Sequence, residues 1–199
     1  MTIYIGLSGT IAAGKGEVLR IIKEKYNSIS YSLSDELRGI LKEVKKEITR
    51  NNLMNIGNKL RKENGSDYIA MRLIKKVKKI KGQHKIIIFD SIRNPAEITA
   101  FKNEFYNNFS LIFTDANRRI RYERIKERKR EGEESLSFNN FVNQDENDCG
   151  RNQPEYGTKL EECKKLADFI IINDKSLSDL EKKVTEVLNL CLKETRKQG

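Results

Sequence analysis

The chain has 199 residues, of which 37% are hydrophobic and 34% charged, so it is long enough for one domain with a substantial core. Two prolines, three cysteines and clear apolar periodicity exclude collagen-like, disulfide-stapled and wholly disordered chains. No apolar run approaches the roughly 20 residues that cross a membrane. The first residues, Met-Thr-Ile-Tyr-Ile-Gly, have no basic region of the kind that opens a secretory signal.

The net charge is +10, from 39 Lys and Arg against 29 Asp and Glu, and it favours anionic partners. Nucleic acid, nucleotides and other phosphate esters all fit this charge, and so does a compositional bias of the source without any function. Cys149, Cys163 and Cys191 are widely spaced and His84 is the only histidine, so no zinc site is expected. A reduced, cytoplasmic compartment without a membrane partner is the expectation, and the oligomeric state stays open.

Five short apolar segments alternate with helical patterns, which predicts an α/β fold with a mainly parallel sheet. The strands are expected at Thr2–Leu7, Ser28–Ser32 (the weakest), Lys85–Phe89, Phe109–Phe113 and Asp168–Ile172. The helices between them are expected at Glu17–Tyr26, Asp35–Ile48, Leu53–Glu63, Tyr68–Ile80, Ala96–Phe105 and Asn117–Arg130. A last helix follows the spacing of Leu177, Leu180, Val184, Val187 and Cys191, and Ser178 with Glu181 is expected to form its capping box.

The first strand leads into Gly9-Thr10-Ile11-Ala12-Ala13-Gly14-Lys15-Gly16, and a helix is expected from about Glu17. A strand, a glycine-rich loop and a helix in this order predict a phosphate-binding loop. Glycines let backbone N–H groups turn toward an anion, and the helix N-terminus adds positive partial charge. Lys15 supplies a mobile charge for the β- and γ-phosphates of ATP. The residues expected to bind the nucleotide are Gly9, Thr10, Ala12, Ala13, Gly14, Lys15, Gly16 and Glu17.

Gly16 departs from the usual loop, in which a Ser or Thr hydroxyl at this position binds Mg²⁺. Direct coordination of Mg²⁺ by the loop is therefore not expected. The metal ion would instead be held through water, by a carboxylate elsewhere and by the phosphates themselves.

A Gly-Lys-Gly ending is common in adenylate-kinase-like P-loop kinases. From Ile3 to about Leu190 the chain resembles small nucleoside monophosphate kinases and dephospho-CoA kinases, and especially their archaeal and viral relatives. The resemblance implies a three-layer P-loop NTPase fold with a mainly parallel five-stranded sheet. It also divides the single domain into a core (about 1–34, 82–127 and 158–199), a helical acceptor-binding insertion (about 35–81) and a lid (about 128–157).

The segment from Ser32 to Arg38 is similar to the Ser-x-Gly-Asp-x-x-Arg element of these kinases, with Ser34 in place of the glycine. By that match Asp35 lies beside the transfer centre, where it receives a proton or organises Mg²⁺, and Arg38 grips the acceptor phosphate. The two residues are three apart and share a helix face. The alternative is an N-capped helix with a surface ion pair.

The segment from Phe89 to Pro95 resembles the Asp-Gly-x-x-Arg element, with Ser91 in place of the glycine. The resemblance implies that Asp90 is the acidic residue near Mg²⁺ and that Arg93 holds the acceptor phosphate. The alternative is a strand end followed by a proline at the first helical position. Arg61, in the insertion, is a further candidate for contact with the acceptor, and a solvated helix face is the rival interpretation.

The segment Asn117–Arg130 is densely basic, and Arg121, Arg124 and Arg128 recur at spacings of three and four. Phosphoryl transfer needs positive groups around the transferred phosphate, and the lid arginines of the family match Arg124, Arg128 and Arg130. The alternative is a solvated basic helix. Phe138–Gly150 is expected to close the lid, or to pair its acidic groups with the arginines. Asn173, after the last strand, lies near the donor adenine in dephospho-CoA kinases, although an ordinary turn is the rival.

The leading hypothesis is an ATP-dependent kinase that phosphorylates a nucleoside or deoxynucleoside monophosphate, with dephospho-CoA as the second acceptor. In it Lys15, Arg124 and Arg128 act on the transferred phosphate, and Asp35 and Asp90 hold Mg²⁺, through water. The substrate-binding set is Asp35, Arg38, Arg61, Arg93, Arg128 and Arg130. Rival hypotheses are an ATP-binding switch without catalysis and, less favoured, a nucleic-acid-binding protein driven by charge.

Overall fold

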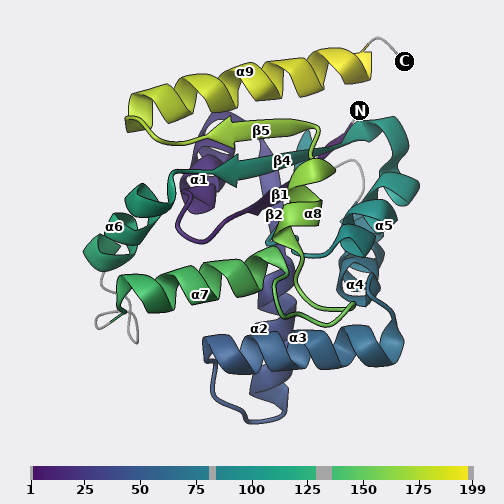
Figure 1. The fold of residues 1–199 in the computed structure, drawn as a ribbon. Helices are drawn as coiled ribbons and strands as arrows, with labels where there is room; N and C mark the ends of the chain where they lie inside the picture. Colours follow the sequence, from purple (N-terminus) through teal and green to yellow (C-terminus); the bar gives the residue numbers. More distant parts are fainter. Residues whose placement is uncertain (1, 81–83, 129–135, 197–199) are drawn as a thin grey trace.

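A fully parallel five-stranded sheet organises the chain in the computed structural model, which describes residues 2–80, 84–128 and 136–196 (Figure 1). The strand order is β2-β3-β1-β4-β5, and all four pairings are parallel. The strands are β1 (Ile3–Gly9), β2 (Ser28–Ser32), β3 (Ile86–Asp90), β4 (Phe109–Asp115) and β5 (Phe169–Ile172). The predicted α/β fold is confirmed, and the ends of each strand lie within two residues of the prediction.

Alternate residues of each strand face two separate hydrophobic layers. Ile3, Ile5 and Leu7 of β1 face α1 (Lys15–Lys25) and α9 (Leu177–Arg196), which lie together on one side of the sheet in Figure 1. Tyr4 faces the other side, which is covered by α2 (Leu33–Glu43), α4 (Tyr68–Val77), α5 (Pro95–Phe105) and α8 (Leu160–Lys165). A Cβ atom at Gly6 would lie 2.7 Å from the Phe109 ring, so glycine at this position allows the second layer to pack closely.

Helix α2 ends at Glu43, five residues before the predicted end at Ile48. The cause is Lys45, which adopts a left-handed φ of 53°. The N–H groups of Lys45 and Lys46 bond back to the carbonyls of Lys42 and Leu41, which is the Schellman pattern of helix ends. Glycine usually occupies this position, so a lysine there gave no stop signal in the sequence.

Helix α9 begins at Leu177, and Ser176 caps it by accepting a hydrogen bond from the N–H of Asp179 (3.2 Å). The predicted capping box of Ser178 and Glu181 is therefore wrong, because Ser178 lies inside the helix. A complete capping box does form at α5, between Asn94 and Glu97.

Two helices were not predicted: α7 (Phe138–Cys149), in the segment expected to close the lid, and α8, which follows that segment. The other elements are α3 (Arg50–Asn64), α6 (Arg118–Arg128) and short 3₁₀ turns at Lys78–Ile80 and Tyr106–Asn108. Among the residues that the structure describes, no helix combines the length and the apolar character needed to cross a membrane.

Candidate active site

The strand register brings the predicted motifs to one edge of the sheet. Leu7, Asp90 and Ser32 are neighbours across β1, β3 and β2, so the phosphate loop, the Asp90 segment and the start of α2 lie side by side. On the other side of β1, Gly9 pairs with Thr114, and Asp115 pairs with Ile172. This carboxyl edge is where ligands bind in open α/β sheets.

The phosphate loop turns into α1 through residues with a left-handed backbone. Ala12 has a φ of 58°, and Gly14, the N-cap of α1, has a φ of 96°. The amide of Asn173 donates a hydrogen bond to the carbonyl of Ala13 (2.9 Å). A Cβ atom at Gly14 would collide with that same amide, so glycine is required there for space as well as for conformation.

Lys15 forms an ion pair with Asp90, and both side chains are largely buried, with 23% and 13% exposed. Ser91 takes a left-handed φ of 68°, and its hydroxyl donates to Asp90 Oδ2 (3.1 Å). Serine thus occupies the conformation for which the resembled kinases use glycine, and its hydroxyl adds a hydrogen bond to the carboxylate. The structure brings Lys15 and Asp90 together, a contact that was not predicted from the sequence.

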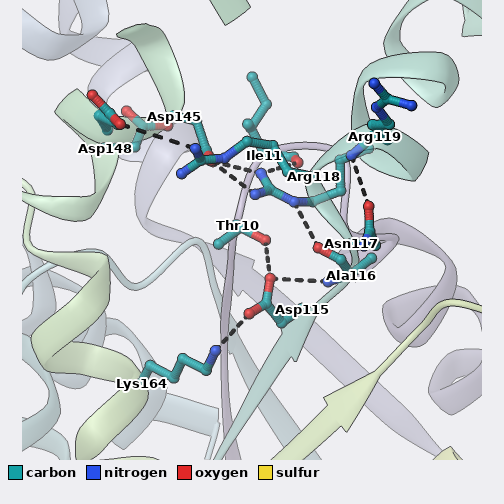
Figure 2. A network of polar contacts seen from close by, with 12 residues as sticks. Thr10, Ile11, Asp115, Ala116, Asn117, Arg118, Arg119, Asp145, Asp148 and Lys164 are labelled. Atoms are coloured by element: carbon teal, nitrogen blue, oxygen red, sulfur yellow. Dashed lines mark hydrogen bonds and ion pairs between the residues drawn. The ribbon is translucent and has the colours of Figure 1, made fainter. Parts of the chain in front are cut away.

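Asp115 links the phosphate loop to α8, and sequence reasoning did not identify it. Its Oδ1 atom accepts from Thr10 Oγ1 (2.7 Å) and its Oδ2 atom from Lys164 Nζ (2.6 Å), as Figure 2 shows. Burial of Asp115 acts to raise its pKa, but the hydrogen bonds from Lys164 and Thr10 outweigh burial, so the pKa lies below its usual value. The signal was available, because Asp115 ends a strand at the same edge as Asp90.

The basic helix α6 turns its arginine stripe inward. Arg121 is only 4% exposed, and its guanidinium donates to both oxygens of Asp145 and to the carbonyl of Ile11 in the phosphate loop (3.3 Å). Arg118 reaches the same carboxylate through Nε (3.2 Å), and Figure 2 shows it beside Asp145. The solvated-helix interpretation of the stripe is therefore wrong. The expectation that acidic groups of α7 pair with these arginines is confirmed.

Arg124 lies between the phosphate loop and the end of β5, on the side of the sheet edge away from Asp90. Its guanidinium donates to the carbonyls of Asn173 (2.9 Å) and Ala13 (3.5 Å). Arg124 and Asn173, both predicted to bind the nucleotide, therefore meet at one carbonyl of the phosphate loop. Arg128 is half-buried at the end of α6. Arg130, also predicted as a lid arginine, lies outside the described residues.

Three arginines predicted to bind the acceptor contact different carboxylates. Arg38 donates to Asp35 Oδ1 (2.8 Å) on the exposed face of α2, which confirms the shared face. Arg93 donates through Nη1 to Asp148 Oδ2 (3.1 Å), and Arg50 donates to the same oxygen (2.6 Å). Arg50 and Asp148 were not identified from the sequence, because no local pattern joins residues that lie 98 positions apart.

Arg61 lies in the interior and not on a solvated helix face. It is 4% exposed, and its Nε and Nη2 atoms donate to Glu97 Oε1 (3.1 and 2.7 Å). The other oxygen of Glu97 accepts from the backbone N–H groups of Arg93 (2.9 Å) and Asn94 (3.1 Å). This arrangement corrects the prediction of direct contact with an acceptor, because the guanidinium is already bound behind the Arg93 loop.

The site offers few oxygen ligands for a metal ion. Gly16 has no side chain and therefore offers no hydroxyl to a metal ion, although a Cβ atom there would meet only open space. Across the described ranges, no group of three or more His, Cys, Asp and Glu side chains gathers in a way that could hold a metal. The Asp90 carboxylate next to Lys15 nevertheless fits Mg²⁺, which typically binds one or two carboxylates, the phosphates of its nucleotide and several waters.

Burial makes two of the cysteines, Cys149 and Cys163, poor nucleophiles. Burial, reinforced by Asp145 and Glu161, raises the pKa of Cys149 to about 11. Burial also raises the pKa of Cys163, the thiol of α8. Both thiols are therefore protonated near neutral pH, and thiolate chemistry is excluded at these two positions.

The sequence matches one protein-family model and several proteins of other organisms over most of its length. The model of the AAA domain family AAA_18 matches residues 5–150. A UPF0200 protein of Methanocaldococcus jannaschii is 31% identical over 191 residues, which cover 94% of this chain and 91% of that protein. A UPF0200/UPF0201 protein of Archaeoglobus fulgidus is 33% identical over 142 residues, and there the match spans 71% of this chain but only 42% of the relative.

Solved structures show the same fold at low identity. A gluconokinase of Sinorhizobium meliloti superposes with a TM-score of 0.55 at 10% identity, covering 98% of this chain and 97% of that one. A shikimate kinase of Aquifex aeolicus gives a TM-score of 0.53 at 18% identity, covering 99% and 100%. At these identities the likeness shows the fold, and a P-loop domain of this type implies nucleotide binding. The chain therefore has the fold of P-loop kinases, and it belongs to the UPF0200 family and to the AAA domain family whose model spans most of it.

Proposed function

We propose that this protein is an ATP-dependent phosphotransferase that moves the γ-phosphate of ATP to a nucleoside or deoxynucleoside monophosphate. The observation that carries the proposal is the pairing of Lys15 with Asp90 at the end of the phosphate loop. This pair joins a cation suited to the β- and γ-phosphates with a carboxylate that is followed, three residues later, by Arg93. The carboxylate alone would also suit a nucleotide switch, so Arg93 is the part of this segment that favours a second, phosphate-bearing substrate.

In the proposed reaction, the backbone of Gly9–Gly16 surrounds the donor phosphates, and Lys15 exchanges Asp90 for phosphate oxygens. Arg93 and Arg38 bind the acceptor phosphate, and Asp35 lies between the two substrates. Catalysis then consists of positioning and charge stabilisation rather than covalent chemistry. Asp90 and Asp35 would hold Mg²⁺ through water, and the ion, when bound, neutralises charge on the transferred phosphate.

Two contacts support a donor-side role for Arg124 and Asn173. Both side chains bond to the carbonyl of Ala13, so neither of them occupies the N–H groups of the loop. We therefore assign Arg124 to nucleotide binding in this proposal. Arg128, one turn further along α6, keeps its assignment to the transferred phosphate from the family resemblance.

The second candidate is a switch that binds ATP without transferring phosphate, and Gly16 is the observation that favours it. The loop lacks the hydroxyl that usually binds Mg²⁺, although there is open space for one. Dephospho-CoA is the second acceptor within the phosphotransferase proposal, since its nucleotide part offers a ribose hydroxyl that could receive the γ-phosphate.

The deciding experiment measures ADP release from Mg-ATP with each ribo- and deoxynucleoside monophosphate, with dephospho-CoA and without acceptor. Turnover that one acceptor stimulates, and that Lys15→Ala and Arg93→Ala abolish, would support the proposal and name the substrate. The matched control is Lys23→Ala, an exposed lysine on α1. Tight ATP binding without stimulation by any acceptor would favour the switch.

A further inference from the structure

Helix α7 carries acidic side chains that pair with arginines from three other parts of the chain. Asp145 pairs with Arg118 and Arg121 of α6, and Asp148 pairs with Arg93 and with Arg50 at the start of α3. In Figure 1, α7 extends from the α6 side of the molecule toward its middle, and α3 is drawn below it. The helix thus bridges the basic helix and the acceptor-side arginines through charge pairs.

The pairing at Asp148 has an unusual distribution of charge. Arg50 and Arg93 both donate to one oxygen, Oδ2, so two guanidinium groups share a single carboxylate. The carboxylate is 7% exposed, whereas the side chains of Arg50 and Arg93 are 41% and 37% exposed. The two cations are therefore open to solvent while their common partner is enclosed.

Asp148 is also poorly placed for the stability of its own helix. It lies in the last turn of α7, where the helix dipole disfavours negative charge. It shares a face with Asp145, three residues earlier, and like charges at this spacing repel. The arginines, and not α7, therefore hold this carboxylate in place.

We propose that Arg50 and Arg93 form a binding subsite for a phosphate monoester, the charged group of the acceptor, and that Asp148 is the counter-ion which this group displaces. A monoester has up to two negative charges and three terminal oxygens, so it matches two planar guanidiniums better than one carboxylate oxygen does. The inference rests on the proposed function for the identity of the ligand. Arg50 is the residue that it adds to the acceptor site.

Inorganic phosphate is the probe, and calorimetric titration measures its affinity in the Lys15→Ala background, which removes the cation of the phosphate loop. We expect Asp148→Asn to tighten phosphate binding about tenfold, because the competing carboxylate is lost. We expect Arg50→Gln to weaken it about tenfold, because a charge-assisted hydrogen bond is lost. In the double variant the gain from Asp148→Asn should disappear.

The matched control is Arg151→Gln, just beyond α7, which removes a 66% exposed arginine whose partner is Glu146 and should leave phosphate affinity unchanged. Thermal unfolding by circular dichroism checks that each variant folds. If Asp148→Asn does not fold, the test is the difference in phosphate affinity between Arg50→Gln and Arg151→Gln. Equal phosphate affinity in those two variants, or no tightening in a folded Asp148→Asn, overturns the inference.

Acceptor kinetics separate this inference from the proposed function. With an acceptor identified, Arg50→Gln should raise its KM about tenfold and leave the KM of ATP unchanged. An unchanged acceptor KM would also overturn the inference. A wild-type protein without acceptor-stimulated turnover that still shows the phosphate-binding changes would refute the phosphotransferase and retain the anion subsite.

Discussion

The phosphate loop and the acceptor-side arginines lie along one edge of the sheet, and the chain holds them by different means. Side chains that support the loop bond to its backbone carbonyls, as Asn173 does at Ala13 and Arg121 at Ile11. Arg93 and Arg50 instead bond to the carboxylate of Asp148. Contacts to carbonyls fix the shape of a loop and leave its N–H groups free for an anion. A carboxylate on an arginine, by contrast, occupies the position that an anionic ligand needs.

This difference indicates that the backbone of the phosphate loop is organised in advance, even though Lys15 must exchange Asp90 for a phosphate. In the proposed acceptor subsite, both arginines must give up the same carboxylate before they bind an anion. Four predictions test the comparison, from the largest expected effect to the smallest.

The buried pair behind Arg93 should dominate stability on the acceptor side. Arg61→Ala leaves the Glu97 carboxylate, which is fully buried, without its partner, and it should cost about 3–5 kcal/mol of unfolding free energy. Urea denaturation measures this loss. Lys59→Ala, on the same helix, removes an exposed pair with Glu63 and should change stability by less than about 1 kcal/mol. Similar losses in the two variants would show that the acceptor side does not depend on this buried pair.

Lys15→Ala and Arg93→Ala should separate the two substrates kinetically. Each variant should lower turnover by roughly two to three orders of magnitude, because each removes a charge next to a reacting phosphate. Steady-state kinetics should show a raised KM for ATP in the first variant and for the acceptor in the second. A raised KM for the same substrate in both variants would remove the distinction between a donor side and an acceptor side.

Two glycines of the loop should respond in opposite directions to the same substitution. Gly14→Ala places a side chain at a φ of 96° and against Asn173, so it should cost about 1–3 kcal/mol. Gly16→Ala lies in α1 with open space at its Cβ position, and it should stabilise the fold by about 0.5–1 kcal/mol. Thermal unfolding compares the two variants. Stabilisation by Gly14→Ala would show that the loop is not held in this shape without ligand.

The smallest expected effect is a pH dependence at Asp115. The pKa of Asp115 is lower in the folded protein than in the unfolded chain. Its contribution to the free energy of unfolding is therefore complete above the unfolded pKa of about 4, and it is lost as the pH falls through the lower, folded pKa. As the pH falls below about 4, wild-type stability should therefore decrease by on the order of 1 kcal/mol more than that of Asp115→Asn.

Melting temperatures across this pH range measure the effect, and Glu155→Gln, at an exposed carboxyl, is the control. If the curves of wild type and Asp115→Asn stay parallel down to pH 2, the network of Thr10, Asp115 and Lys164 contributes nothing to the loop.

The sequence predicted those parts of the molecule that depend on local pattern. Continuous β-branched runs such as Ile86-Ile87-Ile88 indicated buried parallel strands, and the strand before Gly9 together with the helix after Gly16 indicated the phosphate loop. The motifs follow parallel strands, whose carboxyl ends share one edge, and at that edge Lys15 pairs with Asp90, although the pair itself was not predicted.

What the sequence did not reveal depends on contacts between distant residues. The pairs of Arg121 with Asp145 and of Arg50 with Asp148 join positions 24 and 98 residues apart, and no spacing rule connects them. Helix α7 was missed because its asparagines and acidic residues favour loops, and the arginines that neutralise it lie elsewhere. Arg61 was assigned to the surface or to the acceptor because its buried partner is on another helix.

The strand order also has a consequence for how the chain folds. Strand β1 lies in the middle of the sheet, but its partners follow late in the sequence, with Ile3 beside Ile86 and Tyr4 beside Phe109. During synthesis at about 5–20 residues per second, this apolar strand waits on the order of 4 to 20 s before its first neighbour exists. The segment that later supports the phosphate loop is therefore an apolar strand without a partner in the nascent chain, which exposes it to aggregation, and contacts of such long range make its pairing slow.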